Sequence, residues 1–338
     1  CYDWSKEESY GRVAHELANH LEQGGMYVNR IGGNSPQQKP VRLSLGGIAL
    51  GYPTMISKYG KLLGVGPVVW LTMFESNRLP FLWSDILNTT QHVIVPATFQ
   101  EPIFRQSGVT TPISVVPLGV SEQFQYTQRT RKPGEPYTFL SFADRGRRKG
   151  WEYAGFAFMR AFGDDPNYRL ILKGRKENQF PVVANPNIQM LKADMTDEQL
   201  AALYEQCDCM IFPGREGFGL PPREFAATGG TSIALNWGGT ADDLSMWGLP
   251  IASAGMETAW KGHATLEGLG EWAAVDVDDL AQTMKHVAAN RDYYRERGQQ
   301  QSAYVRMKYK WATFAEQVRD IWMEACTTYD QRTLPRAV

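Results

Sequence analysis

The chain has 338 residues, of which 43% are hydrophobic and 21% are charged. These proportions are typical of a globular protein with a large core and argue against a disordered or fibrous chain. The length of the chain favours two domains. The 35 Lys and Arg residues balance 36 Asp and Glu, so a net charge of -1 gives no general attraction to nucleic acid or to an anionic membrane.

The first third of the chain alternates predicted helices with short buried strands. Residues 10–22 carry Val13, Leu17 and Leu21 at intervals of four, which is one apolar stripe of a helix. Brief apolar runs predict strands at 67–72, 93–95 and 113–116, with helices at 81–89 and 98–107. The polar segment 123–136 shows no apolar periodicity and predicts a linker. We therefore expect an N-terminal domain at 1–124 and a linker at 125–136.

A second alternating series follows the predicted linker. Strands are expected at 138–142, 169–173, 209–212 and 232–235, and helices at 151–162, 196–206, 279–290 and 311–329. Strands that alternate with helices are typical of parallel, doubly wound α/β domains, which bind ligands beyond the carboxyl ends of their strands. We place the second domain at 137–310 and a closing helical segment at 311–338.

The segment 213–230, PGREGFGLPPREFAATGG, is the most informative part of the chain. Its glycines and prolines delay a helix until about Pro222, and Gly229 and Gly230 end that helix. The loop amides of Phe218, Gly219 and Leu220 are then bare donors beside the positive end of the helix dipole. Such a loop is suited to an anion such as a diphosphate.

Two carboxylates, Glu216 and Glu224, lie on either side of this predicted anion site. A carboxylate repels phosphate, so we expect these two to accept hydrogen bonds from hydroxyl groups of a sugar or a ribose. We also expect both side chains to project into one pocket. The alternative is a structural strand-turn-helix corner in which Glu224 only complements the helix dipole.

Residues 145–150, RGRRKG, form a cationic loop between a predicted strand and a predicted helix. Arg binds phosphate through two parallel hydrogen bonds, and Lys does so as a point charge. The loop therefore indicates a phosphate site, the alternative being a solvated basic turn.

These segments together resemble a known family. Segment 213–230 resembles the E-x7-E motif of retaining GT-B glycosyltransferases, in particular glycosyltransferase family 4. Further similar segments are Trp70–Pro80, Val93–Val109, Val115–Phe124, Ser141–Phe162 and Ala234–Leu244. The resemblance implies two Rossmann-like domains facing each other across a cleft, with the last helix packing back on the first domain. It also implies transfer of a hexosyl unit from a nucleotide sugar with retention.

The resemblance assigns roles to the residues of the motif and the basic loop. Lys149 and Arg148 are expected to neutralise the donor diphosphate, and Glu224 to bind the ribose. Glu216 is expected to contact the transferring sugar, and we favour a positioning role over that of a nucleophile. The family usually has a basic residue where this chain has Asp144, so Arg145 is expected to supply that charge, with Arg147 as an alternative.

Other matches imply further donor and acceptor contacts. Residues 9–12 resemble the first glycine loop of the family, so Gly11 and Arg12 are expected at the donor, the alternative being a helix N-cap at Ser9. Thr72 and Glu75 stand where the family often has a His-bearing acceptor motif, and we expect them on the acceptor side. Gly238, Gly239 and Asp242 resemble a Gly-Gly-x-x-Glu motif of the family, with Asp in place of Glu, and are expected to brace the donor pocket.

No cofactor or metal is expected, because GT-B enzymes generally need none and no His and carboxylate cluster is visible. The Asp276-Val277-Asp278 tripeptide directly precedes a helix and is interpreted as its N-cap. The expected partners are a UDP- or GDP-sugar and a glycan or other hydroxyl acceptor; nucleic acid is disfavoured. A GT-B nucleotide-sugar epimerase and a non-catalytic nucleotide-sugar binding protein are the alternatives.

The sequence also gives an expectation about location. No apolar run is long enough to span a bilayer, no secretory leader is recognisable, and four cysteines do not form a disulfide framework. We expect a cytoplasmic protein, with a peripheral position at the membrane left open. Whether residues precede Cys1, and the oligomeric state, are left open as well.

Overall fold

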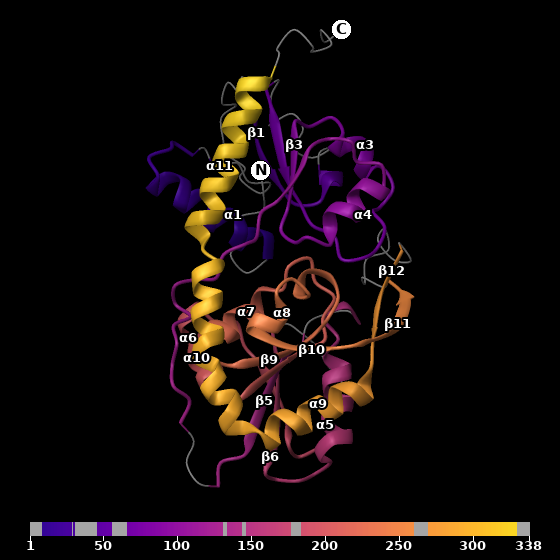
Figure 1. The fold of residues 1–338 in the computed structure, drawn as a ribbon, viewed down its shortest axis with the longest axis vertical. Coiled ribbons are helices and arrows are strands. Elements are labelled where there is room, and N and C mark those ends of the chain that lie inside the picture. Colours follow the sequence, from indigo (N-terminus) through magenta and orange to yellow (C-terminus); the bar gives the residue numbers. More distant parts are fainter. Residues whose placement is uncertain are drawn as a thin grey trace. The chain divides into compact units, whose positions relative to one another are not determined.

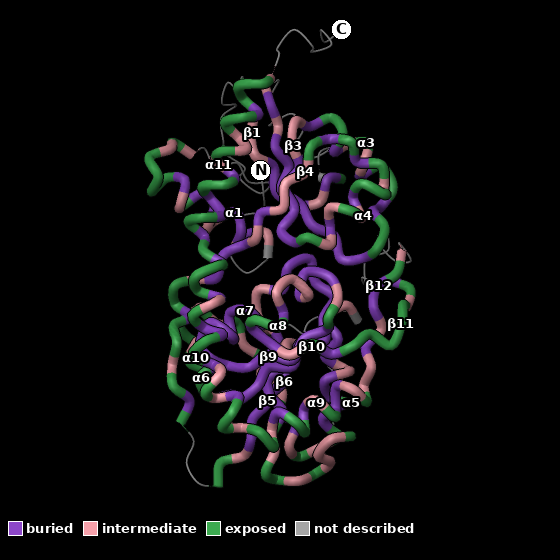
Figure 2. Tube along the Cα trace, in the orientation of Figure 1, coloured by how far each residue is buried: buried purple, intermediate pink, exposed green. Residues whose placement is uncertain are grey.

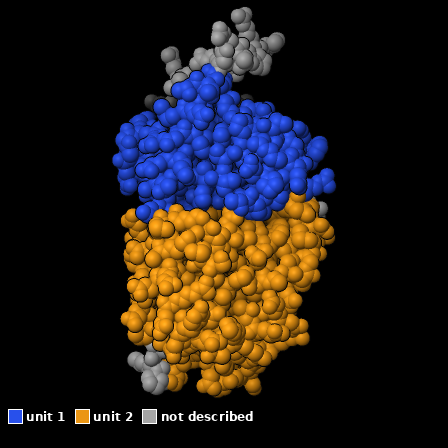
Figure 3. Space-filling view, viewed as in Figure 1, with its two compact units in different colours: residues 1–74, 78–119, 310–338 blue, residues 75–77, 120–309 orange. Residues whose placement is uncertain are grey.

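A computed structural model describes residues 9–28, 30, 46–55, 66–130, 134–143, 147–176, 184–259 and 270–329. The chain divides into two compact units (Figure 3). Unit 1 comprises Cys1–Phe74, Arg78–Gly119 and Lys310–Val338. Unit 2 comprises Glu75–Asn77 and Val120–Tyr309.

Unit 1 is built on a parallel sheet, of which Figure 1 labels β1 and β3, and its strand order is β1-β2-β3-β4. The strands are β1 (Gly47–Leu50), β2 (Val68–Leu71), β3 (His92–Val95) and β4 (Ile113–Val115). The helical elements are α1 (Ser9–Gln23), η1 (Pro53–Met55), α3 (Trp83–Leu87), α4 (Gln100–Gln106) and α11 (Trp311–Thr328). Helix α11 packs against α1 and contacts β2 and β3, so the last helix of the chain completes the unit that holds the first.

Unit 2 contains a parallel sheet with the strand order β10-β9-β8-β5-β6-β7. Its strands are β5 (Tyr137–Phe142), β6 (Tyr168–Gly174), β7 (Ile188–Lys192), β8 (Cys209–Phe212), β9 (Thr231–Leu235) and β10 (Gly248–Ile251). An antiparallel pair, β11 (Ser253–Thr258) and β12 (Glu271–Val275), is separate from this sheet. The helical elements are η2 (Arg147–Lys149), α5 (Trp151–Phe162), α6 (Asp197–Glu205), α7 (Leu220–Ala227), η3 (Gly238–Thr240), α8 (Leu244–Trp247), α9 (Val277–Ala289) and α10 (Arg291–Lys308).

The core of unit 2 lies between the sheet and two of these helices. Strands β8 and β9 are buried along their whole length, as Figure 2 shows for β9, and β8 is a continuous apolar run. Trp151, Ala154 and Phe158 of α5 share one cluster with Leu280 and Met284 of α9. Helices α7 and α10 pack against each other and against β9.

The strand order of unit 2 explains where a ligand site can form. The chain runs from β5 outward through β6 and β7, returns through α6, and resumes at β8 on the other side of β5. Neighbouring strands whose connections leave in opposite directions open a crevice at their carboxyl ends. The basic loop follows β5 and the motif segment follows β8, so the topology brings these two segments together.

Several elements differ from the predictions: strands β1, β7, β10, β11 and β12 and helix α8 were not predicted, and two further differences concern helices α7 and α10. Helix α7 begins at Leu220 rather than at about Pro222, which moves Glu224 beyond the first turn. Helix α10 was not predicted, because its buried positions include Gly298, Gln301 and Ser302 and therefore carry no apolar stripe.

Gly298→Ala is expected to destabilise unit 2, because α10 approaches α7 through this glycine. A Cβ atom at Gly298 would lie 2.1 Å from the carbonyl oxygen of Gly229, which is backbone and cannot move aside alone. We expect urea denaturation to show a loss of about 2 kcal/mol, in the range for overpacked cores. Gly155→Ala in α5 is the control, since nothing lies within 4 Å of its Cβ position and Ala should add up to about 1 kcal/mol. Stabilisation by Gly298→Ala would contradict this account of the helix contact.

Candidate active site

The basic loop and the motif segment are joined by backbone contacts. Gly150 has a φ of 68°, and a Cβ there would lie 2.7 Å from the carbonyl oxygen of Pro213. Only glycine fits this left-handed and closely packed position. The Arg215 amide donates to the Arg148 carbonyl (2.9 Å), and the Arg148 guanidinium donates back to the Arg215 carbonyl (3.0 Å). These contacts fix the basic residues beside the loop that follows β8.

Glu216 is the centre of the charge cluster that results. Its Oε2 accepts from Nη1 of Arg148 at 2.7 Å, and its Oε1 lies 2.9 Å from Nζ of Lys149. The Glu216 side chain is 11% exposed. Arg148 Nη1 also lies 3.8 Å from Oε1 of Glu75, which belongs to unit 2. The structure therefore brings the predicted residues Glu216, Arg148 and Lys149 together, with Glu75 at their edge.

The two cations keep Glu216 ionised. Burial raises the pKa of this carboxyl, but the charges and hydrogen bonds of Arg148 and Lys149 outweigh it and lower the pKa from 4.5 to about 2. The pairing thus contributes about 3 kcal/mol of folding stability that is present above pH 4.5 and is lost as the pH falls toward 2. A carboxylate with this pKa is a poor general base near pH 7 and is suited to accepting hydroxyl hydrogen bonds.

The loop before α7 carries the amide donors that the sequence predicted. The amides of Phe218, Gly219 and Leu220 donate no hydrogen bond within the described part of the chain. Gly219 caps α7 with a φ of 85°. A Cβ at Gly239 would lie 2.3 Å from the carbonyl oxygen of Gly217, and the Gly239 amide donates to the Glu216 carbonyl at 2.8 Å. The loop is therefore braced from behind while its amides stay available at the helix N-terminus.

Glu224 lies in different surroundings from Glu216. Its side chain is buried, and Oε2 accepts from the Tyr204 hydroxyl at 3.3 Å. Because Glu224 lies beyond the first turn of α7, the alternative role as a first-turn complement of the helix dipole loses its basis. The two carboxylates of the motif are held by different partners, one by cations and one by a phenol.

Sequence reasoning missed Arg223, which is fully buried in α7. Its guanidinium donates to four backbone carbonyls: those of Phe218, Gly219, Gly239 and Asp242. The sequence offered one signal: an arginine that directly follows residues 217–222, which are all Gly, Pro or apolar. Its position on the helix gave no indication of burial.

The remaining predicted residues fall in three places. Gly11 and Arg12 lie in the first turn of α1 and not in a glycine loop, so that expectation was wrong in its local structure. Thr72 follows β2 in unit 1, is buried, and donates its amide to Ile94. Asp144 and Arg145 lie outside the described residues.

The interpretation of Asp276 as an N-cap is confirmed, since its side chain accepts from the amides of Asp278 and Asp279. Across the described ranges, no group of three or more His, Cys, Asp or Glu side chains is placed to hold a metal ion. Among the helices that the structure describes, none combines the length and the apolar character needed to cross a membrane.

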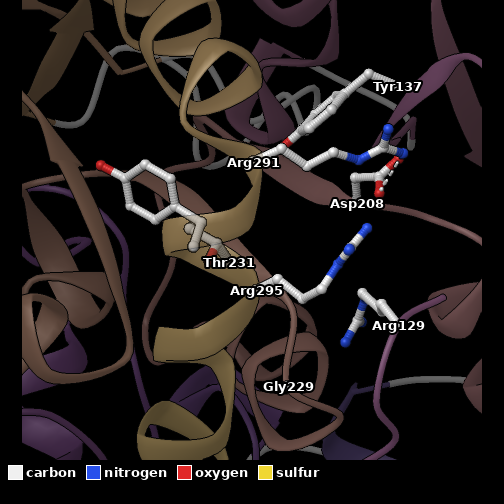
Figure 4. A pocket seen from close by; sticks show the side chains of 8 residues that line it. Arg129, Tyr137, Asp208, Gly229, Thr231, Arg291 and Arg295 are labelled. Carbon is white, nitrogen blue, oxygen red and sulfur yellow. Dashed lines mark hydrogen bonds and ion pairs between the residues drawn. The ribbon is translucent and has the colours of Figure 1, made fainter. Parts of the chain in front are cut away.

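A pocket lies at the opposite, amino end of the same sheet, where Tyr137, Asp208 and Thr231 begin or precede their strands (Figure 4). Its cavity volume is only about 20 Å³. Its cations have protein partners: Arg291 pairs with Asp208 at 3.2 Å, and Arg129 donates to backbone carbonyls. Arg129, from the predicted linker, is thus buried in unit 2 and stabilises its fold.

The fold resembles that of several solved glycosyltransferases. Sucrose-phosphate synthase from Thermosynechococcus elongatus has a TM-score of 0.72 and 16% identity, over 97% of this chain and 96% of that one. HepE from Anabaena, solved in complex with UDP-glucose, has a TM-score of 0.67 and 12% identity, over 96% and 98% of the chains. A glycosyltransferase from Rickettsia africae has a TM-score of 0.64 and 15% identity, over 95% and 96%.

No curated protein sequence matches the chain. Residues 122–248 match the family described as Glycosyl transferases group 1, and this range contains the basic loop, Glu216 and α7. The predicted α/β class with two Rossmann-like, GT-B domains is confirmed by the structural neighbours and the two parallel sheets. The chain therefore has the GT-B fold, and the part of it that is similar to the group 1 glycosyl transferases lies in unit 2.

Proposed function

We propose that this protein is a retaining, metal-independent glycosyltransferase of the E-x7-E type, as in family 4. It moves a hexosyl unit from a UDP- or GDP-sugar to the hydroxyl group of a glycan or another acceptor. The observation that carries the proposal is the cluster of Arg148, Lys149 and Glu216 beyond the carboxyl ends of β5 and β8, directly before the amides of residues 218–220, which donate to no group among the described residues.

The donor diphosphate binds against the 218–220 loop, with Lys149 and Arg148 as its cationic contacts. Charge develops on the leaving diphosphate as the glycosidic bond breaks. Amide donors and cations already in position stabilise this charge without reorganising. Glu224 receives the ribose hydroxyls, and Gly11, Arg12 and Arg145 remain proposed donor contacts.

Glu216 positions the transferring sugar and stabilises positive charge at its anomeric carbon. The low pKa of Glu216 supports this role, because a carboxylate that stays ionised cannot deliver or store a proton near pH 7. The acceptor hydroxyl attacks on the face that the diphosphate leaves, which gives retention, and its proton passes to a diphosphate oxygen. Thr72 and Glu75 remain the proposed acceptor-side residues.

The first test is to incubate the protein with UDP-glucose and GDP-mannose and to measure free nucleoside diphosphate. A transferase releases the nucleoside diphosphate when the sugar passes to an acceptor or, slowly, to water. HepE, which has been solved with UDP-glucose, makes that donor the first choice. The correct nucleoside diphosphate at 100 times its dissociation constant should add about 2.7 kcal/mol of stability, which is visible as a melting shift.

The outcomes separate the alternatives. An epimerase changes the sugar while the nucleotide stays attached, and a binding protein is stabilised but releases no product. Neither stabilisation nor product with any UDP- or GDP-sugar would contradict the proposal.

A further inference from the structure

Arg223 is a buried cation directly behind the loop that carries the free amides. Its side chain is fully buried, and its guanidinium lies against three aromatic rings. The distances to the ring centroids are 4.2 Å for Phe218, 4.7 Å for Trp247 and 5.0 Å for Tyr309. Ring faces and carbonyl oxygens stabilise a guanidinium, but they do not cancel its charge.

No carboxylate is paired with Arg223 in the part of the chain that the structure describes. Arg215, which is also fully buried, is paired with Glu257. Burying a cation without an anion is costly, so such groups are rare unless an anion from outside completes the site. The position of Arg223 therefore indicates a negative ligand nearby.

The hydrogen bonds of Arg223 also set the direction of the loop amides. In a trans peptide the carbonyl of one residue and the amide N–H of the next point in opposite directions. Arg223 binds the carbonyls of Phe218 and Gly219, at 3.1 Å for Gly219. The N–H groups of Gly219 and Leu220 are consequently turned away from Arg223, toward the side on which the loop is not braced.

The charges of the neighbouring cluster make the contribution of Arg223 necessary. Arg148 and Lys149 carry two positive charges, and Glu216 and Glu75 within 4 Å carry two negative charges. This cluster alone gives no net positive charge to a diphosphate. Arg223, at the N-terminal end of α7, adds one positive charge that no carboxylate offsets.

We propose that Arg223 is a positioning residue that aims the amides of residues 219 and 220 and supplies the buried countercharge for the diphosphate of the donor. This inference rests on the proposed function, since it requires a nucleoside diphosphate at the loop. It assigns Arg223 no contact with the ligand, so its effect passes through the loop backbone and through charge.

The test compares ligands that differ only in phosphate. Calorimetry measures the binding of UDP, UMP and uridine to the wild type, to Arg223→Met and to Arg223→Lys. If the protein prefers GDP, the ligands are GDP, GMP and guanosine. Removing the charge should weaken UDP binding at least about tenfold and leave uridine binding within about threefold, so the ratio of the two affinities falls. Arg223→Lys keeps the charge but loses the planar set of guanidinium donors, so its UDP to uridine affinity ratio should lie between those of Arg223→Met and the wild type.

Arg129→Met is the matched control. Arg129 is also a buried arginine that donates to three backbone carbonyls and lies 4.8 Å from a ring, that of Phe225, but it lines the pocket at the opposite end of the sheet (Figure 4). It should lower the melting temperature without changing the UDP to uridine ratio. This separates lost stability from a lost countercharge.

The outcomes distinguish the inference from the proposed function. An unchanged UDP to uridine ratio in Arg223→Met, or an equal fall in Arg129→Met, overturns the inference while the proposed function stands. A wild type that binds neither UDP nor GDP overturns both. If Arg223→Met does not fold, Arg223→Gln retains a donor for the carbonyls and gives the same comparison, with the same results required.

Discussion

Glu216→Gln is expected to lower kcat for sugar transfer by about a thousandfold or more, the size of effect seen when one preorganised electrostatic group is removed from an active site. The substitution keeps the shape of the side chain but removes the negative charge held between Arg148 and Lys149. Without that charge the sugar loses its positioning group. The measurement is the initial rate of nucleoside diphosphate release from the preferred donor.

In Glu216→Gln the affinity for the nucleotide should not fall with the rate of transfer. Lys149 loses its carboxylate partner in Glu216→Gln, and Arg148 loses that partner but keeps Glu75, so UDP or GDP should bind as tightly as in the wild type or more tightly. Glu257→Gln removes a different arginine-paired carboxylate, on β11, and should retain transfer. Normal turnover by Glu216→Gln, or loss of nucleotide binding together with transfer, would show that its role is misassigned.

Lys149→Ala is expected to weaken both nucleoside diphosphate binding and transfer, by roughly 10- to 100-fold in affinity, the range for one charge-assisted hydrogen bond. Nζ of Lys149 lies 2.9 Å from Glu216, and the side chain is only 17% exposed, so its charge acts in a partly desolvated site. Lys149 is a cleaner target than Arg148, whose guanidinium also binds the Arg215 carbonyl and thereby supports the loop.

The ligand series used for Arg223 also serves here. The loss should be largest for the diphosphate, smaller for the monophosphate and absent for the nucleoside. Lys285→Ala, on the exposed side of α9, is the control for a lost surface charge and should leave every affinity unchanged. Equal losses for UDP and uridine would argue that Lys149 does not act on phosphate.

Much of this site could be predicted because its residues lie on loops whose chemistry is local. The glycines and prolines around Phe218 dictate a turn before a helix, whatever the rest of the fold does. The alternation of strands and helices predicts a parallel sheet, but the meeting of that loop with Lys149 depends on the strand order, which the sequence analysis did not predict.

Other features depend on burial, which spacing along the chain does not reveal. Arg223 lies on a helix where a solvent-facing arginine would fit equally well, and only the packing of Trp247 and Tyr309 buries it. Helix α10 was not predicted because it packs through Gly298 and polar residues. Residues 9–12 carry a glycine that suggested a loop, although the local structure is the first turn of α1.

A crystal structure with bound UDP, or GDP if that is the preferred nucleotide, tests the central claim most directly. We expect phosphate oxygens within 3.2 Å of the amides of residues 219 and 220, the range of an N–H···O hydrogen bond, with Lys149 at the same group. Nucleotide bound elsewhere on the protein, such as in the arginine-lined pocket beside Asp208, would contradict the account.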